Sequence, residues 1–345
     1  ESVWKTTVTV AARNDGYEIV NIEPENKTLQ NYAIVIDIGT TTVSGQILDL
    51  VHCGHDICTL AESSDYNSQI RYGDDVISRI MYSRKKNGLE SLQKALVDTV
   101  NGIIHQLIRE SGIKKSSISH LIFAGNTTMT HLFFGLDPKN IMLAPYTPVS
   151  IVYPLVSARD LGLDLEDHAF IQASPCVSSY VGGDIVAGVI GSGMSRSDKV
   201  TLYVDIGTNG EIVLGNKDWL VCASCSAGPA FEGGGIQFGM RAEKGAIEQL
   251  RLNPENYEPM IITIGKEKPK GICGSGLIDC VSELFLTRVL DQNGKFRRDL
   301  ATTRVREGES GYEYVVAYRE NTRIHRDIVV TEVDLANLIR AKAAL

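Results

Sequence analysis

An aspartate followed by glycine and hydroxyl residues occurs twice in this chain, each time directly after a stretch of apolar residues. The first copy is residues 37–42 (DIGTTT) and the second is residues 205–210 (DIGTNG). A glycine lets the backbone approach an anion closely, because no Cβ stands in the way. The N–H groups and hydroxyls that follow can donate hydrogen bonds to phosphate oxygens. The two copies therefore predict two phosphate-binding turns.

The aspartates of these motifs, Asp37 and Asp205, could together hold Mg²⁺ through water, because Mg²⁺ prefers carboxylates and keeps several of its waters. One such turn could be an ordinary loop, but two turns that face each other could hold a polyphosphate from both sides. We also expect Glu211, which follows the second motif, either to face the phosphates or to be solvated. Phosphate binding is assigned to Gly39, Thr40, Thr41, Thr42, Gly207, Thr208, Asn209 and Gly210.

The elements around the two motifs follow one plan. Residues 33–38 and 200–206 are typical of buried strands. Each leads into two further predicted strands, at 42–50 and 56–61 in the first copy and at 211–214 and 219–223 in the second. Asp205 lies 168 residues after Asp37, about the length of one domain. The sequence therefore predicts an α/β fold with two similar halves, residues 32–198 and 199–345, around a nucleotide cleft.

The remaining patterns predict the elements that position these turns. Apolar residues at helical spacing predict helices at 76–81, 92–107, 184–190, 277–285 and 331–345. Strands are expected at 120–124, 169–173 and 314–317, with a helix after the first of them. Residues 1–31 contain one alternating stretch, 3–10, and then polar turns, as in the tail of a preceding domain plus a linker. The start at Glu1 and a last helix without a stop signal indicate a fragment of a longer protein.

Composition excludes several classes of function. The formal net charge is −8 and no block of Lys or Arg stands out, which argues against a nucleic-acid-binding protein. No apolar run reaches the roughly 20 residues that span a bilayer, and we expect no signal peptide from the pattern of the first residues. The seven scattered cysteines predict reduced thiols in a cytoplasmic protein. The pair Cys222 and Cys225 is interpreted as structural or incidental.

The two DIGT motifs resemble those of the acetate and sugar kinase, heat-shock chaperone and actin superfamily, whose halves are actin- or ribonuclease-H-like. Three further stretches resemble a narrower family, the ATP-dependent reductive activators of corrinoid proteins. These stretches are residues 124–135 (AGNTTMTHLFFG), 225–235 (CSAGPAFEGGG) and 271–279 (GICGSGLID). The resemblance extends from about Tyr32 to the end of the chain.

This resemblance implies that ATP and Mg²⁺ drive the reduction of a partner corrinoid protein from cob(II)alamin to cob(I)alamin. A homodimer of this protein is one option for its oligomeric state. It also implies a [2Fe-2S] cluster in a preceding ferredoxin-like domain and an adenosine-binding strand end after Leu345, both outside this chain. The plant-type cluster pattern needs a third cysteine after Cys58, which is not there. Two alternatives remain, a small-molecule kinase and a chaperone-like ATPase of the same superfamily.

The resemblance also assigns roles to residues outside the two turns. Asp184 falls where an acidic residue in the heat-shock chaperone ATPase positions the attacking water, although it could equally be a helix N-cap. Residues 271–276 precede a helix whose N-terminus could attract an anion, or they form a tight turn packed on a sheet. Residues 126–128 are either a capping run or part of the site. The candidate binding residues in these stretches are Gly234, Gly235, Gly274 and Ser275, with Glu232 as a possible ribose or metal contact.

Overall fold

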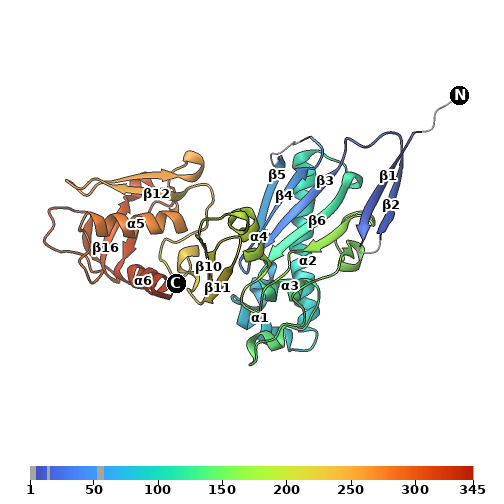
Figure 1. Ribbon diagram of the computed structural model, residues 1–345. Helices are drawn as coiled ribbons and strands as arrows, with labels where there is room; N and C mark the ends of the chain where they lie inside the picture. Colours follow the sequence, from blue (N-terminus) through green and yellow to red (C-terminus); the bar gives the residue numbers. More distant parts are fainter. Residues whose placement is uncertain (1–4, 14–15, 53–57, 345) are drawn as a thin grey trace. The chain divides into compact units, whose positions relative to one another are not determined.

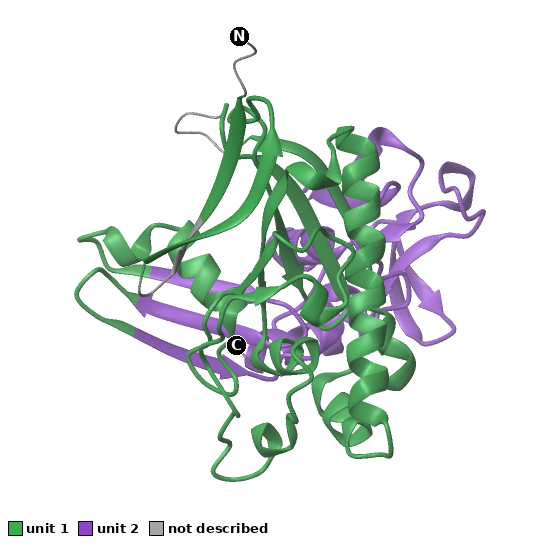
Figure 2. Ribbon diagram, turned by 90° about the vertical axis from the view of Figure 1, so that its right-hand side faces the viewer, with its two compact units in different colours: residues 1–201, 215–220 green, residues 202–214, 221–345 purple. Residues whose placement is uncertain are grey.

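The computed structural model describes residues 5–13, 16–52 and 58–344. This part of the chain divides into two compact units (Figure 2). Unit 1 comprises residues 1–201 and 215–220, and unit 2 comprises residues 202–214 and 221–345. No helix in the described part is both long enough and apolar enough to cross a membrane.

Unit 1 contains a mixed six-stranded sheet in the order β5-β4-β3-β6-β8-β7 (Figure 1). The strands β3, β4 and β5 form an antiparallel meander, β6 runs parallel to β3, and β8 runs parallel to β6. The carboxyl ends of β3, β6 and β8 therefore lie along one edge of the sheet. The strands are β3 (Tyr32–Ile38), β4 (Thr42–Asp49), β5 (Thr59–Tyr66), β6 (Ile118–Gly125), β7 (Val156–Ser157) and β8 (Phe170–Ala173).

The long helix α2 (Gly88–Ser111) packs on β4 and β5 and supplies much of the core of unit 1. It ends at Gly112, whose φ of +69° suits glycine and whose N–H donates to the carbonyl of Ile108. A Cβ at Gly45 of β4 would lie 2.8 Å from the Ile103 side chain, so the helix packs closely because this residue is glycine. The buried face of α2 includes Leu92, Leu96, Val100, Ile103, Ile104 and Leu107.

Three shorter helices complete unit 1. The helix α1 (Val76–Ser83) begins after Asp75, whose carboxylate accepts a hydrogen bond of 2.7 Å from the N–H of Ser78. The other two are α3 (Thr127–Phe133) and α4 (Gly183–Gly191). They follow β6 and β8 in the sequence, which places both helix N-termini beyond the carboxyl ends of these strands.

Unit 2 contains three small sheets, with strand orders β11-β10-β9, β13-β12-β14 and β15-β16-β17. The helix α5 (Gly274–Leu286) packs on β12, and α6 (Glu332–Ala344) packs on β16 and β17. The strands are β9 (Thr201–Ile206), β10 (Gly210–Gly215), β11 (Leu220–Cys225), β12 (Ala246–Leu252), β13 (Pro259–Thr263), β14 (Gly271–Ile272), β15 (Val305–Gly308), β16 (Gly311–Ala317) and β17 (Ile328–Thr331).

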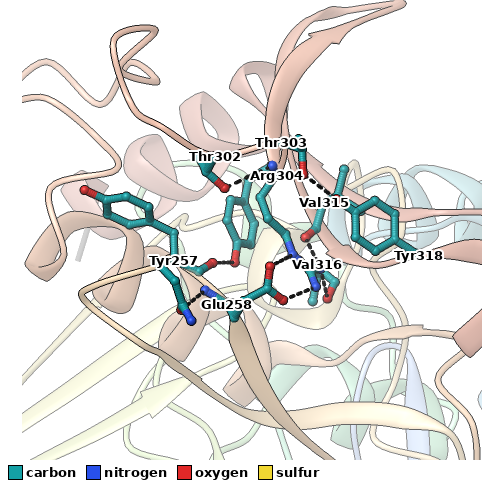
Figure 3. A network of polar contacts seen from close by, with 10 residues as sticks. Tyr257, Glu258, Thr302, Thr303, Arg304, Val315, Val316 and Tyr318 are labelled. Carbon is teal, nitrogen blue, oxygen red and sulfur yellow. Dashed lines mark hydrogen bonds and ion pairs between the residues drawn. The ribbon is translucent and has the colours of Figure 1, made fainter.

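Arg304 fixes the loop before β15 to the rest of unit 2 (Figure 3). Its guanidinium makes two hydrogen bonds with the Glu258 carboxylate, of 3.1 and 2.5 Å, and donates to the carbonyls of Val315 and Val316 at 2.9 and 3.3 Å. The Arg304 side chain is buried, whereas that of Glu258 is half exposed. Arg304 therefore satisfies backbone acceptors that would otherwise lose their hydrogen bonds inside the protein.

Short 3-10 helices connect the elements of both units. They are η1 (Ser68–Tyr72), η2 (Lys115–Ser117), η3 (Lys139–Met142), η4 (Arg159–Leu161), η5 (Met194–Arg196), η6 (Pro229–Glu232), η7 (Ile264–Lys266) and η8 (Arg319–Asn321).

The structure corrects the predicted elements in three places. Residues after position 10 do not form only polar turns, because β2 (Gly16–Pro24) pairs with β1 (Thr6–Arg13) in an antiparallel hairpin. The third strand of the first meander lies at Thr59–Tyr66 rather than 56–61, and residues 53–57 lie outside the described part. In unit 2 the strands β12, β13, β14, β15 and β17 were not predicted from the sequence.

Candidate functional site

The first predicted phosphate turn connects β3 to β4 through Thr40 and Thr41. The N–H of Gly39 donates to the carbonyl of Thr42 at 2.9 Å, and a Cβ on Gly39 would lie 2.6 Å from that oxygen. A side chain here would force the two strands apart, so this position requires glycine. Thr40 is buried, and its hydroxyl oxygen accepts a hydrogen bond of 3.1 Å from Nδ2 of Asn126.

Asp37 lies beside this turn, one residue before the end of β3. It is exposed, and its neighbours across the sheet are Ser44 of β4 and Ala124 of β6. An exposed carboxylate at this edge suits a hydrated Mg²⁺ ion, which binds through carboxylates and retained waters. The Mg²⁺ role of Asp37 remains a prediction.

Asn126 caps α3, one of the two interpretations that the sequence left open, and it also contacts the first turn, while a binding role for residues 126–128 remains a prediction. Its Oδ1 accepts a hydrogen bond of 2.9 Å from the N–H of Met129 and so caps α3, while its Nδ2 donates to Thr40. Thr127 donates its hydroxyl to the carbonyl of Ser178 at 2.5 Å, and every residue of α3 is buried. The first turn is therefore attached to a helix that is itself fixed in the core of unit 1.

Asp184 lies in the first turn of α4, at the same edge of the sheet. The N-cap of α4 is Gly182, so the interpretation of Asp184 as an N-cap is wrong. Oδ1 of Asp184 accepts a hydrogen bond of 2.8 Å from the N–H of Ile185. A Cβ on Gly182 would lie 2.5 Å from the Cα of Asn126, so the start of α4 packs directly against the end of β6. Unit 1 thus brings the first turn, Asn126 and the helix that carries Asp184 to one edge.

The second predicted turn, between β9 and β10, is supported by different residues. The N–H of Gly207 donates to the carbonyl of Asn209 at 2.9 Å, and the N–H of Gly228 donates to that of Thr208 at 2.8 Å. The Thr208 hydroxyl donates to Oε2 of Glu232 at 2.5 Å. Glu232 therefore contacts a predicted phosphate-binding residue directly, and Gly210 begins β10 immediately after the turn.

Asp205 lies near the end of β9 and is partly buried. Burial raises the pKa of its carboxyl, and a hydrogen bond with the Tyr203 side chain lowers it by a smaller amount. A cation beside Asp205 would favour the charged carboxylate, so Mg²⁺ binding at this position would oppose the effect of burial. Glu211, on β10, accepts a hydrogen bond of 3.0 Å from the hydroxyl of Ser224 on β11.

The segment 233–237 of unit 2 is attached to the first two turns of α6. The carbonyl of Gly235 accepts a hydrogen bond of 2.9 Å from Nδ2 of Asn337, and the N–H of Gln237 donates to Asp334 at 2.9 Å. Gly233 and Gly235 have φ values of +85° and +71°, which favour glycine. Gly234 lies between them, against Pro229. Nucleotide binding by Gly234 and Gly235 remains a prediction.

The start of α5 is closely packed. A Cβ on Gly274 would lie 2.1 Å from the carbonyl oxygen of Phe231, and one on Gly276 would lie 2.2 Å from that of Ile247. The Ser275 hydroxyl donates to the carbonyl of Glu248 at 2.9 Å. These contacts favour the interpretation of 271–276 as a tight packed turn, and an additional binding role for Gly274 and Ser275 remains a prediction.

Two polar residues at the first turn were missed by the sequence analysis. Asn67 follows β5 and Arg79 lies in α1, and both side chains are fully buried. Both donate hydrogen bonds to backbone carbonyls of the turn, Asn67 to Gly39 and Arg79 to Thr40. In the sequence, Asn67 and Arg79 are single polar residues within amphipathic segments. Such residues are too common to indicate a contact with the turn.

The cysteines correct one further expectation. Cys58 is disulfide-bonded, so the prediction of seven reduced thiols is wrong at this residue, and Cys53 lies outside the described part. Cys176, Cys222, Cys225, Cys273 and Cys280 are free. Cys225 donates its thiol to the carbonyl of Gly210 at 3.2 Å, while Cys222 is exposed.

Comparison with known proteins identifies the class of fold. The family model described as the C-terminal domain of RACo, the ASKHA domain, matches residues 199–345, and the model of the RACo middle region matches residues 32–197. ASKHA denotes the acetate and sugar kinase, heat-shock and actin superfamily, whose domains bind nucleotides. A solved structure entitled reductive activator for corrinoid,iron-sulfur protein is 46% identical, with a TM-score of 0.90 over 98% of this chain and 54% of that chain.

Curated relatives identify the family. The corrinoid activation enzyme RamQ of Eubacterium limosum is 35% identical over 342 residues, which are 96% of this chain and 56% of that protein. The [Co(II) methylated amine-specific corrinoid protein] reductase of Methanosarcina barkeri is 24% identical over 257 residues, 69% of this chain and 44% of that protein. The chain belongs to the RACo family. It spans about half the length of the relatives it matches.

Proposed function

We propose that this chain is the nucleotide-binding and ATP-hydrolysing part of an enzyme that reductively reactivates a corrinoid protein, converting cob(II)alamin to cob(I)alamin. Membership of the RACo family supports this proposal. Within unit 1 it is also supported by the position of the first turn, Asn126 and the Asp184 helix at one edge of the sheet. Ligands of open α/β sheets bind at the carboxyl ends of the strands, where these three features occur.

ATP is the substrate of the proposed reaction. The turns at Gly39–Thr42 and Gly207–Gly210 would donate hydrogen bonds to its phosphates. Asp37 and Asp205 would hold Mg²⁺ through water, and the ion would supply positive charge to the phosphoryl group. The exposure of Asp37 beside its turn fits this role. In unit 2, Glu232 would orient the Thr208 hydroxyl.

Asp184 would position the water that attacks the γ-phosphate. One of its oxygens accepts the N–H of Ile185, and a carboxylate offers about four lone-pair sites, so it can accept a water hydrogen as well. Phosphoryl transfer depends mainly on positioning and on charge stabilisation rather than on covalent chemistry by the protein. Glu211, which contacts Ser224, is a second acidic residue assigned to the catalytic region.

Energetic coupling explains why ATP would be used. For a one-electron step, each ~59 mV of unfavourable potential costs ~1.4 kcal/mol, so a gap of about 200 mV costs roughly 5 kcal/mol. Preferential binding of one cobalt state of the partner, switched by nucleotide, could supply this free energy. In the described part of the chain, no three His, Cys, Asp or Glu residues are grouped so that they could hold a metal.

ATP hydrolysis by the full-length protein, measured with and without a corrinoid protein, tests the proposal. We expect hydrolysis to increase when the cob(II) form is added and the corrinoid absorption spectrum to change to that of cob(I) when a reductant is supplied. Stoichiometric phosphorylation of an added metabolite would instead indicate a small-molecule kinase. Hydrolysis stimulated by a partner that carries no corrinoid would indicate a chaperone-like ATPase.

The proposed coupling also predicts a difference in affinity between the two cobalt states. In its resting nucleotide state the full-length protein should bind the cob(II) form of its partner more tightly than the cob(I) form, which selects the inactive partner. Because this preference alone opposes reduction, the nucleotide must reverse it for the coupling to favour cob(I). Equal affinities, measured by titration under anaerobic conditions, would exclude this mechanism, because a ligand that binds two states equally does not shift their equilibrium.

A further inference from the structure

Asn67 fixes two of the peptide groups in the first turn. Its side-chain Nδ2 donates to the carbonyl of Gly39 at 2.9 Å, and its backbone N–H donates to the carbonyl of Thr41 at 2.9 Å. The Asn67 side chain also accepts the N–H of Gln69 at 3.1 Å and so caps η1. The side chain is fully buried, so it cannot itself touch a ligand.

Arg79 fixes the peptide group between these two. Its Nη2 donates to the carbonyl of Thr40 at 2.6 Å, Nε donates to the carbonyl of Gly73 at 3.0 Å, and Nη1 donates to Oε1 of Gln69 at 3.1 Å. Gln69 in turn donates to the carbonyl of Leu92 on α2, which ties the guanidinium to the core helix. The buried guanidinium is therefore held by several contacts and directed at the turn.

The geometry of the peptide bond gives these contacts a consequence. In a trans peptide the C=O and N–H bonds point in opposite directions, and the one cis peptide in the described part is Ala144–Pro145. Because the carbonyls of Gly39, Thr40 and Thr41 are each held by a donor, the orientation of each following N–H is fixed as well. Successive N–H groups held in one arrangement form a concave anion-binding site.

We propose that Asn67 and Arg79 are positioning residues for phosphate. They hold the three carbonyls of the first turn, so that the N–H groups of Thr40, Thr41 and Thr42 are oriented for an anion before it arrives. The inference deepens the proposed function and depends on it, because it assumes that the first turn binds the phosphates of a nucleotide. Preorganised donors of this kind bind charge without the cost of reorientation.

The positive charge of Arg79 also favours anion binding at the first turn. The acceptors of its hydrogen bonds are neutral: two carbonyls, one amide and the sulfur of Met129 at 3.3 Å. Burial lowers its pKa to about 10, while the nearby Asp75 and Asp74 raise it, so the group remains protonated at neutral pH. A buried cation directly behind the turn makes the electrostatic potential there more favourable for an anion.

The test compares phosphate-dependent affinity with stability in the full-length protein. Asn67→Ser keeps a residue that can cap η1 but is too short to reach the Gly39 carbonyl. Arg79→Lys keeps the positive charge but loses the guanidinium fork. Affinities for Mg·ATP and Mg·ADP are measured by calorimetry, adenosine affinity is measured by competition, and the melting temperature of each variant is recorded.

We expect both variants to weaken ATP and ADP binding by about tenfold, the effect of losing one well-placed hydrogen bond. Adenosine binding should change by less than about twofold, within the few tenths of a kcal/mol expected away from the contact. A matched control is Thr99→Val, which removes a part-buried hydrogen bond of 3.2 Å from the N–H of Ser68, the first residue of η1, without touching the turn. This control should lower the melting temperature and leave the ATP-to-adenosine ratio unchanged.

The possible results distinguish a failure of the proposed function from a failure of the positioning role. If the wild-type protein binds no nucleotide, the proposed function is wrong. If the wild type binds ATP but Asn67→Ser keeps the same ATP-to-adenosine ratio, the positioning role is wrong while the proposed function stands. If Arg79→Lys does not fold, Asn67→Ser alone decides, because its helix cap is retained.

Discussion

Asn126 and Thr40 are joined by one hydrogen bond of 3.1 Å, from the side-chain amide of the first to the hydroxyl oxygen of the second. The two residues are 86 positions apart, and each follows a parallel strand of the same sheet. The bond connects a predicted phosphate turn to the cap of a fully buried helix. Movement of the turn would therefore disturb α3.

Asn126→Asp should separate the two functions of this residue. The aspartate can still cap α3, so the melting temperature should change little. It cannot donate to Thr40 and it adds a negative charge beside the turn, so Mg·ATP should bind about tenfold or more weakly. Asn126→Ala is the matched comparison, since it should also lower stability by about 1 kcal/mol through loss of the cap. Equal ATP affinity in wild type and Asn126→Asp would contradict the assigned contact.

Asp184→Asn should reduce hydrolysis while leaving the fold intact. Asparagine can accept the Ile185 N–H as the aspartate does. It loses the charge that orients water, for which a ~10²-fold decrease in turnover is typical. Loss of a negative charge from the first turn of α4 should cost only about 0.3–1 kcal/mol in stability. The measurement is partner-stimulated phosphate release beside a melting curve. If turnover of the variant stays within about threefold of wild type, well short of the ~10²-fold decrease, Asp184 has a structural role alone.

The raised pKa of Asp205 predicts a pH-dependent stability difference. Because the folded-state pKa lies above that of the unfolded chain, this group favours folding below the unfolded pKa, and the contribution is lost as pH rises through the folded pKa. Asp205→Asn stays neutral and avoids this loss. The variant should therefore melt at a higher temperature than wild type near pH 7, and the difference should vanish near pH 4. About 2–4 °C corresponds to 1 kcal/mol in a domain of this size.

Mg·ATP binding that involves Asp205 should depend on pH in the opposite sense to stability. Mg·ATP would require the ionised carboxylate, so wild-type affinity should decrease as the pH falls through the raised pKa of Asp205. Asp205→Asn should bind Mg·ATP weakly at every pH. Calorimetric titrations between pH 5 and pH 8 test this, and identical pH profiles for wild type and variant would exclude Asp205 as a magnesium residue.

Two glycine substitutions should have opposite effects. In Gly39→Ala the new Cβ would lie 2.6 Å from a backbone oxygen, so we expect lower stability and loss of nucleotide binding. In Gly102→Ala, on the exposed side of α2, the new Cβ meets no atom within 4 Å. This change should stabilise the protein by roughly 0.5–1 kcal/mol through helix propensity. Urea denaturation of the two variants tests both expectations, and a stable Gly39→Ala that binds ATP normally would contradict the turn geometry.

Arg304→Lys should destabilise unit 2. A lysine cannot serve Glu258 and the carbonyls of Val315 and Val316 together, so buried acceptors would lose their donor at a cost of about 1–3 kcal/mol. Arg297→Lys is the control, because the Arg297–Asp299 pair is largely exposed, and this variant should unfold as the wild type does. Similar unfolding midpoints for all three proteins would show that the Arg304 network adds little stability.

Local patterns were sufficient for the elements next to the repeated motif. The strands β3, β4, β9 and β10 were expected within two residues of their observed bounds, since apolar runs that end in DIGT are informative within a single window. The family was also recognised from the sequence, because several short motifs of that family occur together in this chain. Strand β12 was missed although Ile247, Leu250 and Leu252 are buried, since a glycine-rich stretch precedes it and its alternation is irregular.

The supports of the turn could not be predicted in the same way. Asn67 is 28 residues from Gly39, and Arg79 is 39 residues from Thr40, with ordinary neighbours in each case. Whether an asparagine or arginine at these positions is exposed or buried depends on packing that one sequence does not encode locally. The second strand of the first hairpin, β2, was missed for a related reason, since its residues are mostly exposed and its apolar alternation is interrupted at Val20.

The unequal supports of the two turns limit how far the motif can be transplanted. The four residues Asp-Ile-Gly-Thr are the same in both copies, but Thr40 is held by an amide with a buried cation behind the turn, and Thr208 is held by a carboxylate. Grafting the hairpin of residues 32–49 onto another scaffold would transfer the motif without Asn67, Arg79 and Asn126. Such a graft should adopt the strand-turn-strand shape and still fail to bind phosphate, because three distant parts of the chain hold the turn in its working conformation.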